Sequence, residues 1–88
     1  MKPNEKRDNM LLSDAIRKRI NYYLENNNMK LWKLYKASGI PKSTLYAFMN
    51  SNTMTLPKLD TLHHICEGFG ITIREFFNDP MFDETEQD

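Results

Sequence analysis

Residues 30–50, KLWKLYKASGIPKSTLYAFMN, constrain the fold of this chain more than any other stretch. Apolar residues recur there at helical spacing on both sides of Gly39 and Pro41, which predicts two short amphipathic helices. Gly39 supplies the positive φ that ends a helix, and Pro41 cannot continue the first helix but can begin the second. We therefore predict helices over residues 30–38 and 42–50, joined by a tight turn.

The charges of the chain are unevenly distributed, although the formal net charge is zero. Residues 1–36 carry nine Lys or Arg against four Asp or Glu, whereas residues 60–88 carry one Arg against eight acids. This asymmetry predicts a basic face and an acidic tail, so the neutral total does not exclude an anionic partner. A length of 88 residues suits one small domain.

Several kinds of site are not expected from this sequence. Cys66 is the single cysteine, so we expect no disulfide and no cysteine-based metal site, and the adjacent His63 and His64 point apart on a helix. No nucleophile–base set, carboxylate pair or glycine-rich phosphate loop is recognisable, so we expect no enzymatic activity. We likewise expect no cofactor, no metal and no small-molecule ligand.

Neither a signal segment nor a membrane span is recognisable in the sequence. The N-terminus has no apolar signal segment, and no run approaches the ~18 apolar residues that a membrane span needs. We therefore expect a soluble, cytoplasmic protein that does not contact a membrane.

The N-terminal part of the chain predicts an arm and a first helix. Residues 1–10 are polar and aperiodic, and we expect a flexible arm over residues 1–12. Ser13 or Asp14 is expected to cap a helix that runs to about Asn26. The basic cluster at 17–19 is expected to be a solvated face rather than a DNA contact; it consists of Arg17, Lys18 and Arg19.

The C-terminal part predicts two more helices and a tail. Thr55 is expected to cap a fourth helix, with Pro57 in its first turn. Glycines at 68 and 70 are expected to end it, and its apolar face is Leu59, Leu62, Ile65, Cys66 and Phe69. The sequence Thr72-Ile73-Arg74-Glu75 matches a capping box and predicts a fifth helix over 72–77. The domain is thus expected to be all-α over residues 13–78, with an acidic tail at 79–88 that is disordered from 83.

These features together resemble the phage repressor and Cro-like (XRE-type) helix-turn-helix family. The resemblance covers about residues 13–77, and it is carried by residues 34–48 and by four downstream motifs: LPKLDTL at 56–62, IC at 65–66, FGIT at 69–72 and EFF at 75–77. It implies a five-helix, lambda-repressor-like domain that binds double-stranded DNA. Such a domain acts as a sequence-specific transcriptional regulator, most often a repressor.

The resemblance also implies which residues touch DNA. The helix at 42–50 is expected to enter the major groove, and the base-reading positions of the family's motif match Lys42, Ser43, Thr44 and Ala47, with Tyr46 on the rim. Phosphate contacts are expected from polar residues of the neighbouring segments, which are Lys30, Lys33, Lys36, Asn50, Asn52 and Lys58.

Three departures from the family's pattern are visible. Lys30 and Leu31 replace the usual Ser or Thr followed by a phosphate-contacting Gln, and Tyr35 replaces a small Ala. Leu24 and Met49 replace an Arg–Glu pair, a substitution that buried ion pairs often tolerate. We expect these changes to leave the fold intact and to alter the phosphate contacts of the helix at 30–38.

The family generally works as symmetric dimers on paired half-sites, so we expect a homodimer. The predicted dimer contact is an apolar set that exceeds what a short terminal helix needs: Ile73, Phe76, Phe77, Met81 and Phe82. An alternative function is a protein-interaction adaptor or anti-repressor on a degenerate helix-turn-helix fold. Such an adaptor would use the same phenylalanines and the acidic tail. A regulator would instead require one basic face, formed by Lys30, Lys33, Lys42 and Lys58.

Overall fold

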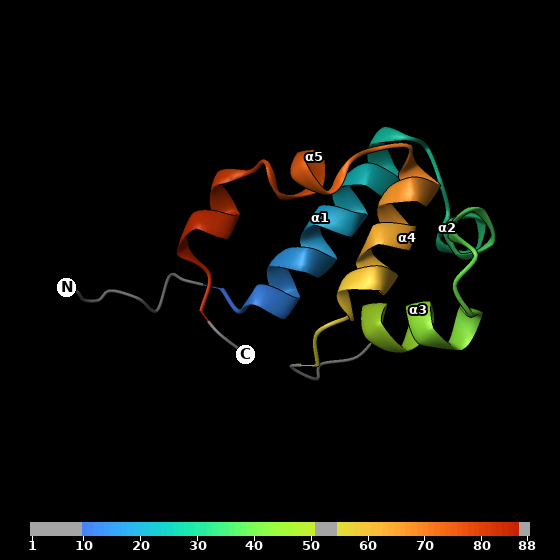
Figure 1. Ribbon diagram of the computed structural model, residues 1–88, viewed down its shortest axis with the longest axis horizontal. Coiled ribbons are helices and arrows are strands. Elements are labelled where there is room, and N and C mark those ends of the chain that lie inside the picture. The colour runs from blue at the N-terminus through green and yellow to red at the C-terminus, as the bar shows by residue number, and fades with distance from the viewer. Residues whose placement is uncertain (1–9, 51–54, 87–88) are drawn as a thin grey trace.

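The computed structural model describes residues 10–50 and 55–86, which form five α-helices and one 3₁₀ helix (Figure 1). The elements are α1 (Leu12–Asn26), α2 (Leu31–Ser38), α3 (Lys42–Met49), α4 (Leu59–Phe69), α5 (Ile73–Phe77) and the 3₁₀ helix η1 (Pro80–Glu84). The predicted all-α fold with five α-helices is confirmed. The predicted bounds of the pair at 30–38 and 42–50 differ from those of α2 and α3 by one residue at one end of each.

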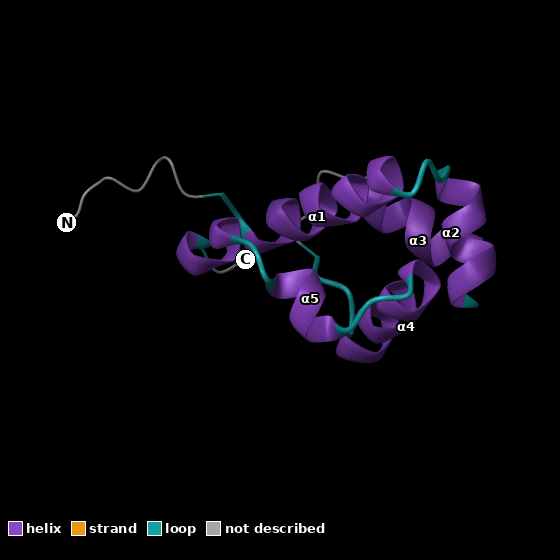
Figure 2. Cartoon of the chain, turned by 90° about the horizontal axis from the view of Figure 1, so that it is seen from above, coloured by secondary structure: helices purple, strands orange, loops and turns teal. Residues whose placement is uncertain are grey.

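Apolar side chains from all five α-helices meet in one core. Seen from above, α1 and α4 form two sides of the domain, and α2 and α3 join them at one end (Figure 2). The buried residues recur at helical spacing along each element, as amphipathic helices require. They are Ile16, Ile20, Leu24, Leu34, Ile40, Leu45, Leu62, Ile65, Cys66 and Phe76.

Gly68 allows α4 to lie directly against α2. A Cβ atom at this position would meet Leu34 Cδ1, Ser38 Cβ and the Ser38 backbone nitrogen, each at 3.2 Å. Gly68 therefore serves helix packing and does not end α4 as predicted. Gly70 ends the helix, in the left-handed conformation with φ 76°.

The predicted cap of the first helix is wrong. Helix α1 starts at Leu12 with Leu11 in the N-cap position and no capping side chain, and Ser13 is buried within its first turn. The Leu12 N–H instead donates to the backbone carbonyl of Glu86 at 3.1 Å. A distant segment thus satisfies one of the amides that a local cap would otherwise serve.

The start of the fourth helix was also predicted wrongly. Helix α4 begins at Leu59 with Lys58 as its N-cap residue, so Thr55 and Pro57 precede the helix. Leu59, expected on the apolar face, is 69 % exposed. In contrast, the capping box of α5 is confirmed: the Glu75 N–H donates to Thr72 Oγ1 at 3.0 Å, and the Thr72 N–H donates to Glu75 Oε1 at 2.9 Å.

Part of the acidic tail is structured, contrary to the prediction of disorder from residue 83. Helix η1 extends to Glu84, and the Glu86 N–H donates to the Met10 carbonyl at 2.9 Å. Phe82 packs edge-on against Phe77 with ring centroids 4.8 Å apart. Aromatic packing and backbone pairing therefore anchor this segment in spite of its charge.

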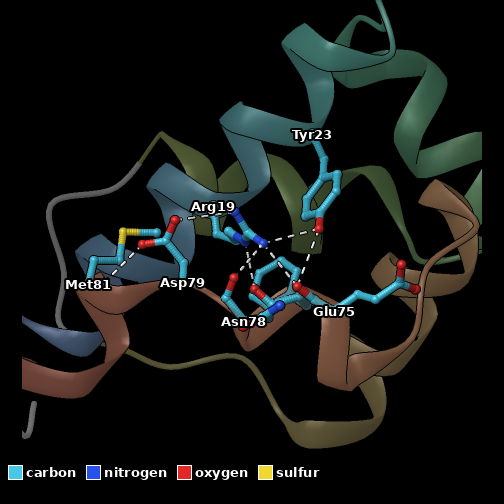
Figure 3. A network of polar contacts seen from close by, with 7 residues as sticks. Arg19, Tyr23, Glu75, Asn78, Asp79 and Met81 are labelled. Atoms are coloured by element: carbon cyan, nitrogen blue, oxygen red, sulfur yellow. Dashed lines mark hydrogen bonds and ion pairs between the residues drawn. The ribbon is translucent and has the colours of Figure 1, made fainter.

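Arg19 joins this C-terminal segment to α1, which corrects its prediction as part of a solvated face (Figure 3). Its side chain is buried, and Nε donates to the Phe76 carbonyl at 2.7 Å while Nη2 donates to the Glu75 carbonyl at 2.9 Å. Nη1 lies 3.5 Å from Asp79 Oδ2, and Nη2 also donates to the Tyr23 hydroxyl at 3.2 Å. Arg19 thus satisfies carbonyls at the C-terminal end of α5, which have no partner within the helix.

Candidate nucleic-acid interface

The turn between α2 and α3 is fixed by local hydrogen bonds. Gly39 is left-handed with φ 78°, and its N–H donates to the Tyr35 carbonyl at 3.1 Å. The Ser38 hydroxyl donates to the same carbonyl at 3.3 Å and accepts from the Ile40 N–H at 3.4 Å. Because Ile40 is itself buried, the turn is tied to the core and sets the angle between the two helices.

Arg17 fixes the other end of α3, which corrects its prediction as part of a solvated face. Its Nε donates to the Phe48 carbonyl at 2.7 Å, and its guanidinium carbon lies 4.5 Å from the centre of the Phe48 ring. Nη1 also pairs with Asp14 at 3.0 Å. A signal for this role exists in the sequence, because Arg17 lies four residues after Ser13 and three before Ile20, both buried.

The outer face of α3 carries the predicted base-reading residues together. Lys42, Ser43, Thr44 and Ala47 are exposed, whereas Tyr46 is half-buried. Tyr46 contacts the other members of the interface, since the Lys42 ammonium lies 5.5 Å from its ring centre and the Tyr35 ring lies edge-on at 6.1 Å. The opposite face of the helix contributes Leu45 to the core, at 1 % exposure.

The sequence on both sides of α3 is basic. Residues 26–59 contain five lysines and no acid, and the predicted phosphate-contacting residues that the structure describes are all exposed: Lys30, Lys33, Lys36, Asn50 and Lys58. Asn52 lies outside the described residues. In both views α2 and α3 lie toward one end of the long axis and the acidic helix η1 toward the other (Figures 1 and 2). The segment that contains α2 and α3 and lacks acids, and the acidic helix η1, therefore lie at opposite ends of the described molecule.

A hollow beside α3 brings two of the predicted sets together. Its volume is about 550 Å³, and Thr44 and Ala47 of α3 line one side of it. Leu56 and Lys58, from the segment before α4, line it as well. The predicted base-reading and phosphate-contacting residues thus border the same depression.

The predicted dimer contact is largely part of the fold. Phe76 has 0 % exposure, so its assignment to a dimer surface is corrected: it is a core residue. Ile73, Phe77, Met81 and Phe82 are half-buried. The three phenylalanines of the predicted set form one cluster, with Phe76–Phe82 ring centroids 6.1 Å apart and Phe76–Phe77 centroids 5.1 Å apart.

The remaining candidate groups have no place in this interface. Within residues 10–50 and 55–86, no three His, Cys, Asp or Glu side chains gather closely enough to hold a metal ion. None of the helices described has the length and apolar character needed to cross a membrane. Cys66 is buried in α4, and burial raises the pKa of its thiol to about 11.

Comparison with known proteins identifies the family. Searches of curated proteins and of solved structures found no match. The family model of the Cro/C1-type HTH (helix-turn-helix) DNA-binding domain matches residues 19–80, which is more than half of the chain. This segment contains the helix pair, its turn and the exposed face of α3. The resemblance inferred from the sequence is confirmed, and the chain belongs to the Cro/C1-type helix-turn-helix DNA-binding family.

Proposed function

We propose that this protein is a sequence-specific transcriptional regulator, acting as a repressor, that inserts α3 into the major groove of double-stranded DNA. One observation carries the proposal: Lys42, Ser43, Thr44 and Ala47 are exposed together on a helix whose opposite face is buried. They lie in a stretch that contains lysines and no acids. An α-helix fits the major groove of B-DNA, where each base pair presents a distinct pattern of donors and acceptors.

The base-reading set favours modest discrimination at each half-site. Lys42 donates to O6 or N7 of guanine, and the methyl groups of Thr44 and Ala47 pack against a thymine methyl. Ser43 can donate or accept and is therefore less selective. A good bidentate contact discriminates by ~1–3 kcal/mol, and this set lacks the Arg, Asn and Gln side chains that make such contacts. Sequence-dependent DNA shape supplies the remaining specificity.

Phosphate contacts fix the register of α3 on the duplex. We assign them to the exposed groups Lys30, Lys33, Lys36, Asn50 and Lys58, and to Asn52 from the sequence pattern. Each lysine that neutralises a phosphate releases counterions. It should contribute about 0.9 to the slope of log affinity against log salt concentration.

We further propose that the protein binds paired half-sites as a homodimer, in the cytoplasm where its operator lies. The contact would use the half-buried side chains of Ile73, Phe77, Met81 and Phe82 and not Phe76. Sedimentation equilibrium at high micromolar concentration tests the assembly. A monomer at that concentration in the presence of a palindromic duplex would contradict it.

The burial of the phenylalanine cluster favours the regulator over an adaptor or anti-repressor. An adaptor would need Phe76, Phe77 and Phe82 on its surface, yet Phe76 is fully buried and the other two pack against it. The four lysines that a regulator needs, Lys30, Lys33, Lys42 and Lys58, are all exposed.

Selection of binding sites from random duplexes tests the proposed function. We expect a palindromic motif to be enriched, and Lys42→Ala and Thr44→Ala to weaken binding and relax preference at separate positions of the motif. Lys18→Ala is the matched control, because Lys18 is an exposed lysine of α1. Absence of any enrichment, together with absence of salt-dependent duplex binding, would refute the proposal and favour the adaptor.

A further inference from the structure

Trp32 is an exposed aromatic residue that neither the core nor the base-reading set uses. It is the only tryptophan of the chain and is 48 % exposed on the outer side of α2. The ammonium groups of Lys33 and Lys36 lie 5.9 and 5.5 Å from its ring centre. A large apolar ring with two cations beside it offers a partner both apolar area to bury and positive charge.

This ring belongs to a continuous surface that reaches α3. Trp32 lies three residues before Tyr35 on the same helix, and Tyr35 meets Tyr46 of α3 edge-on at 6.1 Å. Tyr46 in turn lies 5.5 Å from the Lys42 ammonium, in the first turn of α3. We call this surface the aromatic–lysine belt, and its members are Trp32, Lys33, Tyr35, Lys36, Lys42 and Tyr46.

The chemistry of the belt points to a partner that alternates anionic and apolar groups. A nucleic-acid backbone has this character, because phosphates follow one another with deoxyribose rings between them. The belt starts where the predicted base-reading residues lie, and no acid occurs in residues 26–59 to repel a phosphate. An acidic peptide would satisfy the lysines but would not account for the continuity of the belt with Lys42.

We propose that the aromatic–lysine belt binds the sugar–phosphate backbone of the DNA that flanks the half-site. Trp32 packs against a deoxyribose, and Lys33 and Lys36 contact the adjoining phosphates. The proposal rests on the proposed function and extends it, since it adds a sugar contact by Trp32 to the phosphate contacts of Lys33 and Lys36 and places all three on the flanking duplex. Affinity should therefore depend on the length of duplex on the α2 side of the half-site.

The single tryptophan makes a direct test possible. The full chain is titrated with two duplexes of the selected site, one ending at the half-site and one extended by several flanking base pairs. Labelled-duplex anisotropy measures binding, and acrylamide quenching of Trp32 fluorescence measures protection of the ring. We expect quenching to fall at least twofold with the extended duplex only, and we expect this duplex to bind more tightly than the short one.

Substitutions distinguish the contribution of the Trp32 ring to binding from that of the lysine charges. Trp32→Ala should weaken binding of the extended duplex roughly tenfold, the scale of a central aromatic contact, and should leave the short duplex unaffected. Lys36→Gln should lower the salt slope by about 0.9 for the extended duplex. Tyr22→Ala is the matched control, because Tyr22 is 47 % exposed but lies on α1 outside the belt. Thermal unfolding of each variant verifies that it is folded.

The possible failures are distinguishable. If neither duplex binds, the proposed function and the belt are both refuted. If duplexes bind while Trp32 stays equally quenched and Trp32→Ala binds normally, the belt alone is refuted. Equal protection of Trp32 by a single strand of the same sequence would replace the proposal with a base-stacking site. Equal protection by polyglutamate would replace it with a site for an acidic protein.

Discussion

Different chemistry stabilises the two ends of the molecule. At the end that carries α2 and α3, apolar side chains such as Leu34 and Leu45 fill the interior, and polar side chains remain on the surface. At the other end, α5 and η1 are attached to α1 through the buried Arg19 and through backbone pairing of Glu86 with Met10 and Leu12. One end thus keeps its hydrogen-bonding groups available, whereas the other uses them internally.

This difference fits the proposed function. A surface that contacts bases and phosphates needs unpaired donors on a rigid support, and an apolar interior provides that support without using them. The C-terminal segment is short, and its acidic residues cannot build a larger apolar core. A buried arginine that pairs with several carbonyls is an effective way to attach such a segment, because carbonyls at the end of a helix lack partners within it and one arginine side chain supplies several donors.

Substitution of Arg19 should destabilise the attachment of α5 and η1 to α1. Arg19→Met keeps the apolar stem but leaves the carbonyls of Glu75 and Phe76 and the carboxylate of Asp79 without this donor. We expect the free energy of unfolding to fall by about 3 kcal/mol, because a hydrogen bond that involves a charged group contributes ~1.5–3 kcal/mol and Arg19 makes several of them to carbonyls that are partly buried. Urea denaturation measures the change, and Lys18→Met on the exposed side of α1 is the control. A loss below ~1 kcal/mol would show that the network contributes little.

Gly68→Ala should destabilise the packing of α4 against α2. The added Cβ would lie 3.2 Å from the Ser38 backbone nitrogen, which cannot rotate away as a flexible side chain can. Overpacking of this kind costs ~1–3 kcal/mol, more than the gain of up to ~1 kcal/mol from the better helix propensity of alanine. Thermal unfolding of this variant is compared with that of Glu67→Ala, at an exposed site of the same helix. A stabilised Gly68→Ala variant would mean that α2 and α4 can separate freely.

Thr72→Ala removes one half of the capping box and should have a smaller effect. The Glu75 N–H loses its acceptor at the start of α5, so we expect a loss of about 1 kcal/mol. Because Thr72 lies outside the interface, the affinity for DNA should not change. Denaturation and duplex titration of the same variant test both statements, and Thr72→Ser, which keeps the hydroxyl, should restore the stability.

Cys66 lies in the core that both ends share. Ionisation of its thiol should affect the stability of the fold only at alkaline pH. Burial raises the pKa of its thiol from 9.0 to about 11, so the folded protein resists ionisation that the unfolded chain undergoes. The stability difference between wild type and Cys66→Ala should be constant below pH 9 and should shift against the wild type between pH 9 and 11. All other groups are common to the two proteins, so their contributions cancel in the comparison. A difference independent of pH up to 11 would contradict this expectation.

Helical periodicity accounts for what the sequence predicted well. The spacing of Leu34, Ile40 and Leu45 around Gly39 defined the helix pair, and the capping box at Thr72 defined the start of α5. Both signals are local, because the residues that make each contact lie within one or two turns of one another. The exposure of the base-reading positions followed from the same periodicity.

Most of the sequence-based predictions that were wrong involve contacts between segments distant in the sequence. Arg19 was assigned to a solvated face because it is charged, although its position three residues after Ile16 and four before Tyr23 places it on the buried stripe of α1. The tail was expected to be disordered because of its composition, and the partners that order it, Met10 and Leu12, lie at the opposite end of the sequence. Periodicity shows which face of a helix is buried, but it does not show which carbonyls or rings lie opposite.

The pairing of Met10 with Glu86 has a practical consequence for measurements on this protein. The chain enters and leaves the described domain at one place, at the end of the long axis remote from α2 and α3 (Figure 1). Attachment to a sensor surface through either terminus would therefore place the anchor on the side of the described domain remote from α3. Immobilised protein should retain the affinity for duplexes that it has when free, whichever terminus carries the anchor.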